Sequence, residues 1–488
     1  MVLLLVLAVA VAEPRADPTT RLVEQACRSQ GIEALLGASD ASPLTSTHRL
    51  RQLYEDPRLE FALRDLEDEL DALDGGEHWS WRVRPTGALV LGTRTPDYRS
   101  GDDEAGGISA RSSLDSRLYR PWKGQVFELA VTPEIRADVG PDPTPELGAL
   151  PRELWGGLHG PSWTVGGGLR DRWLGPGRHG GLILTDNASP APLFGAAWEG
   201  HLAPPIRPDI HWGTIRLEAG AGWMTGDRDD VERPGWLLMD LRWAPVPRIE
   251  LGASRMGLFG GVDRPTPSLG QLLLPTDPHV YDDPDQEEPD QDEIAALDIR
   301  VNLPLVAWGL PLDYLELWWQ YGGEDVIARE LLGVPVPSLA GVANLGGMEL
   351  VRTPWTLTVE GARVLDDYFR WYTGHRVYHE GFTRNGHAMG MGPGGDSLTA
   401  WGALAWFPGE RGAEIWVERI HRVAVAEALG DNLLALATDE WRDSVGLRGW
   451  QFRESVGWWR LGLSIERSRG LDFVPGSDAW AWRISLEG

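Results

Sequence analysis

Two stretches of the sequence, far apart along the chain, carry the side chains best suited to binding a ligand. Their aromatic residues offer flat apolar faces on which the rings of a sugar can stack; these are Trp173, Trp371, Tyr372 and Tyr378. Their polar residues can form directional hydrogen bonds with hydroxyl groups; these are Arg172, Asn187, His375, Arg376 and Asp396. Together they predict a carbohydrate-binding site. A structural alternative stays open, because Trp and Tyr also collect where a membrane meets water and Arg also pairs with Asp within a fold.

A glycine pattern in the first stretch matches the letters of a dinucleotide-binding loop. Gly175, Gly177 and Gly180 have the required spacing. That loop works only between a strand and a helix, because the helix N-terminus meets the pyrophosphate. Here an apolar, strand-like run at 182–185 follows instead. We therefore reject nucleotide binding and predict a unit of strand, turn and strand.

The sequence gives no positive sign of a metal site or of catalysis. His375 and His379 stand four residues apart beside Glu380, but the residues around them favour a strand or loop and no further ligand completes a zinc motif. We therefore interpret both histidines as structural or sugar-contacting. No Gly-x-Ser-x-Gly motif occurs, and carboxylates are too abundant to single out a glycosidase pair. We predict no enzyme, no metal and no cofactor.

The charge balance limits the partners. The chain has 488 residues, with 45 Lys and Arg against 72 Asp and Glu, and a formal net charge of −27. Such a chain repels polyanions, so we predict no nucleic-acid binding. Residues 281–293 contain eight carboxylates, and we expect a solvated loop there rather than a calcium site, since the regular calcium-loop spacing is missing.

The N-terminal part of the chain divides into two segments. Residues 1–12 are apolar and end on a small-x-small site, which predicts a secretory signal peptide. Residues 13–75 are predicted to form a small helical domain, because leucines recur every three or four residues; they are Leu59, Leu63, Leu66, Leu70 and Leu73.

After residue 75 the hydrophobic period changes to two, which indicates β-strands. Trp355, Leu357 and Val359, for example, alternate with polar residues. We count about 18 such runs of about 8 to 11 residues, the length a tilted strand needs to cross a bilayer. Long loops are expected at 96–107, 141–160 and 265–293. The alternation fits both a β-sandwich and a membrane barrel, and the size of the sheet favours the barrel, because closure removes exposed edges.

Three ordered motifs resemble the Wzi family of capsule assembly proteins. They are the block DRWLGPG with the following GLIL and NASP at 171–190, the strand IELGASRMGLFGG at 249–261, and the glycine-rich segment WYTGHRVYHEGFTRNGHAMGMGPGGDS at 371–397. The sequence departs from the family at Leu174, where the family often has Trp, and at its end, Gly488, where barrels usually carry a terminal aromatic residue.

The resemblance implies a fold and a function. The fold would be mainly β, a large antiparallel transmembrane barrel of about 18 strands at 76–488 in the outer membrane, with the helical domain in the periplasm. The function would be export, assembly or surface attachment of capsular or other exopolysaccharide, without catalysis, by contact with outer-membrane lipid and a periplasmic export protein. A diffusion porin and a secreted carbohydrate-active β-protein remain alternatives. We expect residues 371–397 to fold over or into the mouth of the barrel.

Overall fold

The computed structural model describes most of the chain beyond residue 79. The described ranges are 80–92, 107–122, 125–139, 146–160, 162–201, 212–226, 228–273, 291–331, 334–365, 371–375, 377–385, 387–423, 438–453, 457–471 and 475–487. The predicted signal peptide and helical domain, at 1–12 and 13–75, lie outside them. No helix within these ranges is long and apolar enough to cross a membrane.

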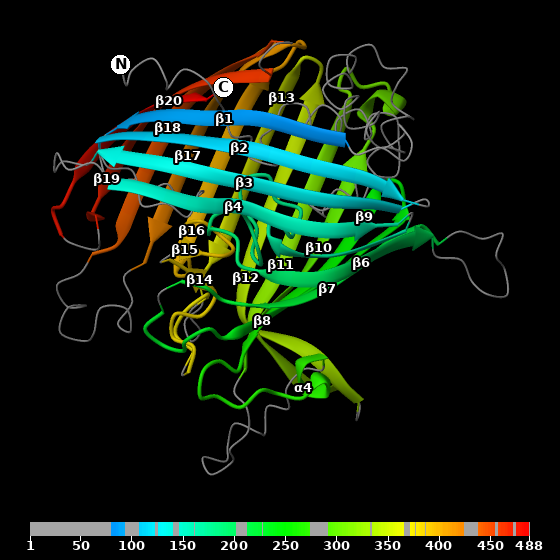
Figure 1. Ribbon diagram of the computed structural model, residues 1–488. Coiled ribbons are helices and arrows are strands. Elements are labelled where there is room, and N and C mark those ends of the chain that lie inside the picture. The colour runs from blue at the N-terminus through cyan, green and yellow to red at the C-terminus, as the bar shows by residue number, and fades with distance from the viewer. Residues whose placement is uncertain are drawn as a thin grey trace.

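Eighteen antiparallel strands form one large sheet (Figure 1). They are β1 (Ser80–Gly92), β2 (Gly107–Trp122), β3 (Gln125–Val139), β4 (Glu146–His159), β5 (Trp163–Leu169), β6 (Leu193–His201), β7 (Thr214–Trp223), β8 (Gly235–Val246), β9 (Ile249–Phe259), β10 (Gln291–Leu303), β11 (Tyr314–Leu331), β12 (Val334–Arg352), β13 (Trp355–Val364), β16 (Ser397–Trp406), β17 (Arg411–Arg422), β18 (Glu440–Arg453), β19 (Gly457–Arg469) and β20 (Ala479–Glu487).

The sheet closes on itself. Each strand pairs with the next along the chain, β13 pairs with β16, and β20 pairs back with β1, where Leu91 lies opposite Ile484. Closure leaves the sheet without an edge strand. The predicted large antiparallel barrel of about 18 strands is therefore confirmed.

The barrel is apolar outside and polar inside. On β13, Trp355, Leu357 and Val359 are 48%, 37% and 41% exposed, whereas Thr358 and Glu360 are 3% exposed each. This is the reverse of a soluble sandwich, in which the apolar face points inward. It matches a barrel whose outer face meets lipid and whose polar face lines the lumen.

The two rims of the barrel differ. We call the rim where β1 begins and β20 ends the terminal rim; six of its connections have two to four residues, and the two longer ones are 202–213 and 304–313. The opposite rim carries the longest connections, at 170–192, 260–290 and 365–396. Apart from the two-residue connection at 332–333, every connection of the opposite rim has six residues or more. Mostly short turns on one side and mostly long loops on the other are typical of outer-membrane barrels, which have their short turns in the periplasm.

The structure corrects two of the loops expected from the sequence. Residues 146–159 form β4, whose alternation is hidden by glycines and by Pro151, beside an irregularity in the pairing at Pro133. Asp292 and Glu293 belong to β10 and are buried, at 1% and 5% exposure, instead of lying in a solvated loop. Arg255 compensates Glu293 by an ion pair, so this carboxylate can be buried.

The expected strand at 182–185 is also reduced. The described residues there make a single antiparallel bridge between Leu174 and Leu184, within a loop. The run is apolar because it packs in the core of the protein; Leu182 and Ile183 are fully buried. An apolar run of this length does not distinguish a strand from another buried segment.

Candidate functional site: a plug of two loops in the lumen

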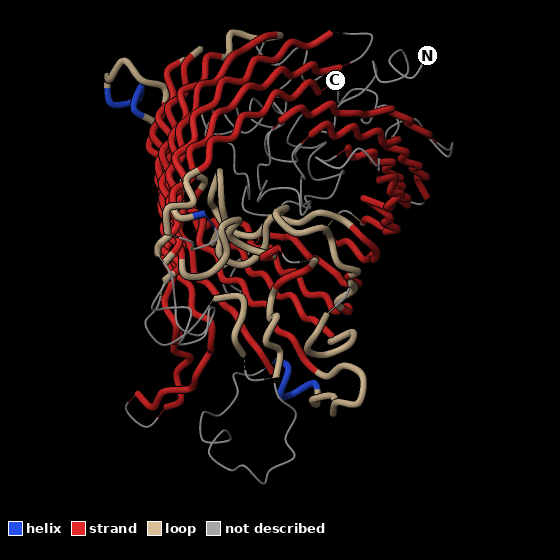
Figure 2. The backbone as a smooth tube through the Cα atoms, turned by 90° about the vertical axis from the view of Figure 1, so that its left-hand side faces the viewer, coloured by secondary structure: helices blue, strands red, loops and turns tan. Residues whose placement is uncertain are grey.

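Two connections from the opposite rim fold into the barrel. Residues 170–192 join β5 to β6, and residues 371–396, which include the short strands β14 (Thr383–Arg384) and β15 (His387–Ala388), precede β16. We call these two segments the lumenal plug. Figure 2 shows loops crossing the interior of the barrel between its walls. Their apolar side chains form one buried cluster with inward-facing residues of the wall, such as Trp318 and Leu345.

The two segments of the plug are bonded to each other. The Tyr372 hydroxyl donates to the Leu182 carbonyl oxygen at 2.7 Å and accepts from the Met391 amide at 2.9 Å. The Asn187 amide nitrogen donates to the Ala388 carbonyl oxygen at 2.6 Å. The plug is therefore a single folded unit, although its two segments lie about two hundred residues apart, as the separation of 201 between Asn187 and Ala388 shows.

One carboxylate on the wall holds the turn at the tip of the first segment. Glu360 on β13 accepts hydrogen bonds from the backbone amides of Arg178, His179 and Gly180 at 2.6, 3.1 and 2.7 Å. The indole nitrogen of Trp318 donates to the same carboxylate at 3.1 Å. Because Glu360 is only 3% exposed, these four donors replace the water that the buried charge would otherwise need.

An ion pair, a hydrogen bond and a ring stack fix the same segment to other strands. Arg178 donates to Glu316 on β11 at 3.0 Å, and His179 lies 2.5 Å from Glu418 on β17. The His179 ring also stacks on Trp401 of β16, with 4.7 Å between the ring centroids. The first segment therefore touches several sides of the barrel wall.

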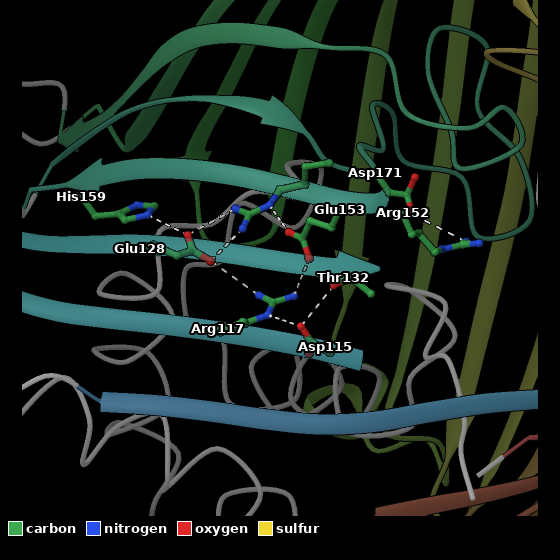
Figure 3. Close-up of polar contacts among 9 residues, drawn as sticks. Asp115, Arg117, Glu128, Thr132, Arg152, Glu153, His159 and Asp171 are labelled. Carbon is green, nitrogen blue, oxygen red and sulfur yellow. Dashed lines mark hydrogen bonds and ion pairs between the residues drawn. The ribbon is translucent and has the colours of Figure 1, made fainter. Parts of the chain in front are cut away.

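The base of the first segment joins a charged network on the inner wall. Glu128 on β3 is 1% exposed; it pairs with Arg170 at 2.7 Å and lies 2.9 Å from His159 of β4. Arg170 also pairs with Glu153 at 2.6 Å, and Arg117 of β2 reaches Glu153 at 3.3 Å. Figure 3 shows these side chains pointing toward one another across neighbouring strands. The network fixes where the chain leaves β5 and enters the lumen.

The candidate sugar-binding residues all belong to the plug, and most are buried. Trp371, Tyr372 and Tyr378 are 1% exposed, Asn187 is 2% exposed, and Arg172, Trp173 and Asp396 are 8% exposed. His375 is half-buried, and Arg376 lies outside the described residues.

Several of these side chains already have partners in the protein. The Trp371 indole nitrogen donates to the Gly341 carbonyl oxygen at 2.5 Å, and the Tyr378 hydroxyl donates to that of Gly260 at 3.0 Å. The His375 ring stacks on Tyr378 at 5.6 Å. In this arrangement the ring faces of Trp371 and Tyr378 pack on protein, and their direct contact with a sugar stays a prediction.

Other polar residues of this region are open to solvent. Asp229, in the connection between β7 and β8, and His379 and Asn385, in the second segment of the plug, are exposed. Asp229 lies against the plug, because its amide donates to the Glu380 carboxylate at 2.6 Å. Sequence reasoning missed Asp229 and Asn385, since a single polar residue in a loop carries no signal of its own.

A clasp joins the β7–β8 connection to the plug. Arg228 donates to both carboxylate oxygens of Asp230, at 2.9 and 2.8 Å, and to the carbonyl oxygen of Gly381 at 3.1 Å. Burial raises the pKa of the Asp230 carboxyl, but hydrogen bonds from Arg228 and from the amides of Val231 and Glu380 outweigh burial and hold this pKa below its ordinary value.

Protonation of Asp230 should loosen this clasp. The pKa of Asp230 in the folded protein lies below its ordinary value of 3.8. The stabilisation that its carboxylate contributes is therefore fully present above pH 3.8 and is lost as the pH falls through the folded pKa. At pH 7 we expect Asp230→Asn to speed hydrogen exchange at 228–234 and 377–385 by about tenfold. The wild type should loosen comparably only in strong acid, after correction for intrinsic exchange rates. Equal protection of the variant and the wild type at pH 7 would contradict the clasp.

Comparisons with known proteins agree with the fold. The model of a family described as capsule assembly protein Wzi matches residues 152–480. No curated protein sequence matches the chain. Among solved structures, the chain is similar to Wzi of Escherichia coli, an outer membrane protein involved in group 1 capsule assembly and a carbohydrate-binding β-barrel; the identity is 17%, the match covers 99% of each chain, and the TM-score is 0.66.

Two barrels of Pseudomonas aeruginosa are more distant. For OpdL the identity is 12%, the match covers 84% of this chain and 98% of that one, and the TM-score is 0.45. For OccD3 (OpdP) the identity is 10%, the coverage is 83% and 90%, and the TM-score is 0.48.

Proposed function

We propose a function from the premise that the chain belongs to the Wzi family of capsule assembly proteins, which the match over residues 152–480 shows. The protein acts in the outer membrane, without catalysis, in the export, assembly or surface attachment of a capsular or other exopolysaccharide. It does so by binding the polysaccharide at the opposite rim, on the outer surface of the lumenal plug.

The observation that carries this proposal is the plug within a barrel that is apolar outside. A secreted soluble protein would not expose a wall of Leu, Val and Trp to water, which argues against that alternative. A diffusion porin needs a wide aqueous lumen, whereas this barrel holds two loop segments whose apolar side chains form one buried cluster with the wall. The arrangement favours a binding surface over a diffusion pathway.

The orientation follows from the difference between the rims. Short turns and both termini of the barrel belong in the periplasm, and long loops outside the cell. The helical domain predicted at 13–75 would then lie beneath the barrel in the periplasm, where an export protein could reach it. The plug surface would face the polysaccharide.

We assign the candidate residues to this surface in two layers. Arg172, Trp173, Asn187, Trp371, Tyr372, His375, Tyr378 and Asp396 form or adjoin the frame that shapes it. Arg376, which lies outside the described residues, is kept as a candidate contact. The exposed side chains of Asp229, His379 and Asn385 form hydrogen bonds with sugar hydroxyls.

A triple substitution tests this surface. Replacing Asp229, His379 and Asn385 together by alanine should weaken binding of purified capsular polysaccharide by about a hundredfold, because each of the three lost hydrogen bonds is worth about 1 kcal/mol. Titration calorimetry on the protein in detergent measures the affinity, and fractionation measures the amount in the outer membrane, which should not change.

A matched variant at the terminal rim serves as the control. Arg248 and Glu410 are exposed there, and their replacement by alanine should leave binding unchanged. Normal binding by the triple variant would remove this surface from the site. Recovery of the wild type without detergent in a soluble fraction would contradict the function proposed for it in the outer membrane.

A further inference from the structure

The connection between β10 and β11 at the terminal rim has an unusual surface. Residues 304–313 include the short 3-10 helix η3 (Leu305–Trp308). Every residue at 306–311 is exposed and none is charged. Three large apolar side chains stand out, Val306 at 60%, Trp308 at 61% and Leu310 at 46% exposure. Water is a poor environment for such a cluster.

The loop is built to hold these side chains outward. Gly309 adopts a φ of 77°, which closes η3 and lets its amide donate to the Val306 carbonyl oxygen at 3.0 Å. Leu305 is only 7% exposed and anchors the loop from below. At its other end, Asp313 accepts from the amide and hydroxyl of Thr353 at 2.8 and 2.6 Å. The exposure is therefore a defined feature of the fold.

The loop points away from the barrel axis. In Figure 2 a short blue helix, η3, projects sideways from the wall at one end of the barrel, whereas α4 (Leu269–Leu273) lies at the other end. The wall that continues from it is apolar, with Leu297 of β10 57% exposed and Trp319 of β11 48% exposed. The loop thus extends the lipid-facing surface sideways.

Its composition also separates this loop from other connections on the same rim. The turn at 247–248 carries Arg248 and the turn at 407–410 carries Glu410, both exposed. Charged residues are expected where a turn enters water. Two other tryptophans of this rim, Trp212 and Trp355, are 52% and 48% exposed, as in the aromatic belt that marks the interface of a membrane.

We propose that residues 305–311 insert into the headgroup and upper acyl region of the phospholipid leaflet at the terminal rim, with Trp308 as the anchor. The proposal rests on the membrane placement stated above. The indole ring has an apolar body and a polar N–H, which suits this depth. Val306 and Leu310 flank it on the same uncharged loop. The anchor fixes the depth of the barrel on the side of β10 and β11.

The single cysteine of the chain makes a site-specific test possible. A Cys27→Ser background carrying Trp308→Cys, labelled with an environment-sensitive fluorophore, is reconstituted into phospholipid vesicles with a nitroxide on a shallow acyl position. We expect lipid quenching at this site at least about twofold stronger than for the same label at Arg248→Cys. Heat-modifiable migration in electrophoresis confirms that each variant is folded.

A label at Leu297→Cys tests the membrane placement of the barrel separately from the lipid anchor at 305–311. Because Leu297 lies on the outer wall, lipid nitroxides on a deep acyl position should quench it in any inserted barrel. Quenching at 297 together with a label at 308 that only an aqueous quencher reaches would overturn the anchor and favour a periplasmic protein as the partner of the loop. Absence of lipid quenching at 297 would contradict the membrane placement itself.

Discussion

Replacing Glu360 with alanine is expected to release the lumenal plug while the barrel stays closed. The carboxylate accepts from three consecutive backbone amides, Arg178 to Gly180, and from the Trp318 indole. Alanine leaves these four buried donors without an acceptor. Breaking a buried, hydrogen-bonded charge of this kind costs about 3–5 kcal/mol, and the cost falls on the plug because it is the plug that Glu360 holds.

Two measurements follow the release. In planar bilayers the Glu360→Ala protein should conduct ions better than the wild type, because the released plug no longer packs against the lumenal wall. Limited proteolysis should cut the segment 170–192, which the wild type protects. Heat-modifiable migration should persist, because the ladder between β13 and its neighbours is made by the backbone.

Two further variants provide an intermediate case and a control for the release of the plug. Glu360→Gln keeps one carbonyl oxygen as an acceptor but loses the charge, so its conductance should fall between those of the wild type and the alanine variant. Glu410→Ala removes an exposed carboxylate at the terminal rim and should change nothing. A Glu360→Ala protein with wild-type conductance and protease resistance would show that the contacts of Arg178 with Glu316 and of His179 with Glu418 suffice to hold the plug.

Much of the barrel was predictable from the sequence, because the period-two pattern is local. Trp355, Leu357 and Val359 read as one face of a strand, and the structure places them on the outer wall. The pattern could not tell inside from outside, since a sandwich and a membrane barrel share it. It failed on β4, where adjacent glycines and Pro151 interrupt the alternation.

The site was predictable only in part. The glycine-rich segments were recognised as loops, and the prediction that 371–397 folds into the mouth agrees with its place in the plug. Glu360 was not recognised, because every strand carries polar residues that face the lumen and the sequence does not distinguish Glu360 from the others. Its role arises from contacts across 180 to 182 residues of sequence, which no local pattern encodes.

Trp371 can support polysaccharide binding either by packing within the plug or by direct contact with the sugar. Trp371→Ala removes a ring that is 1% exposed, packs edge-on against Tyr372 at 5.6 Å and bonds to the Gly341 carbonyl oxygen. A buried Trp replaced by Ala costs about 3–5 kcal/mol. We expect polysaccharide binding to fall strongly and the segment 371–396 to become sensitive to protease, as measured on the same preparation.

A second substitution on the wall distinguishes packing from direct contact with sugar. Gly322 of β11 faces Trp371, so closely that a Cβ there would lie 2.8 Å from the ring carbon Cη2. In the Trp371→Ala protein the ring no longer blocks this Cβ, whose nearest remaining neighbour is the Ala295 carbonyl oxygen at 3.0 Å. Gly322→Val can then fill part of the space from the side of the wall, once the neighbouring strand shifts by a few tenths of an ångström. If Trp371 acts by packing, the double variant recovers protease resistance and polysaccharide binding together, whereas Gly322→Val alone is destabilised by the clash. Recovered protease resistance without recovered binding would instead make the indole ring itself a contact of the polysaccharide, because a valine on the wall restores volume to the core but offers no ring face to a sugar.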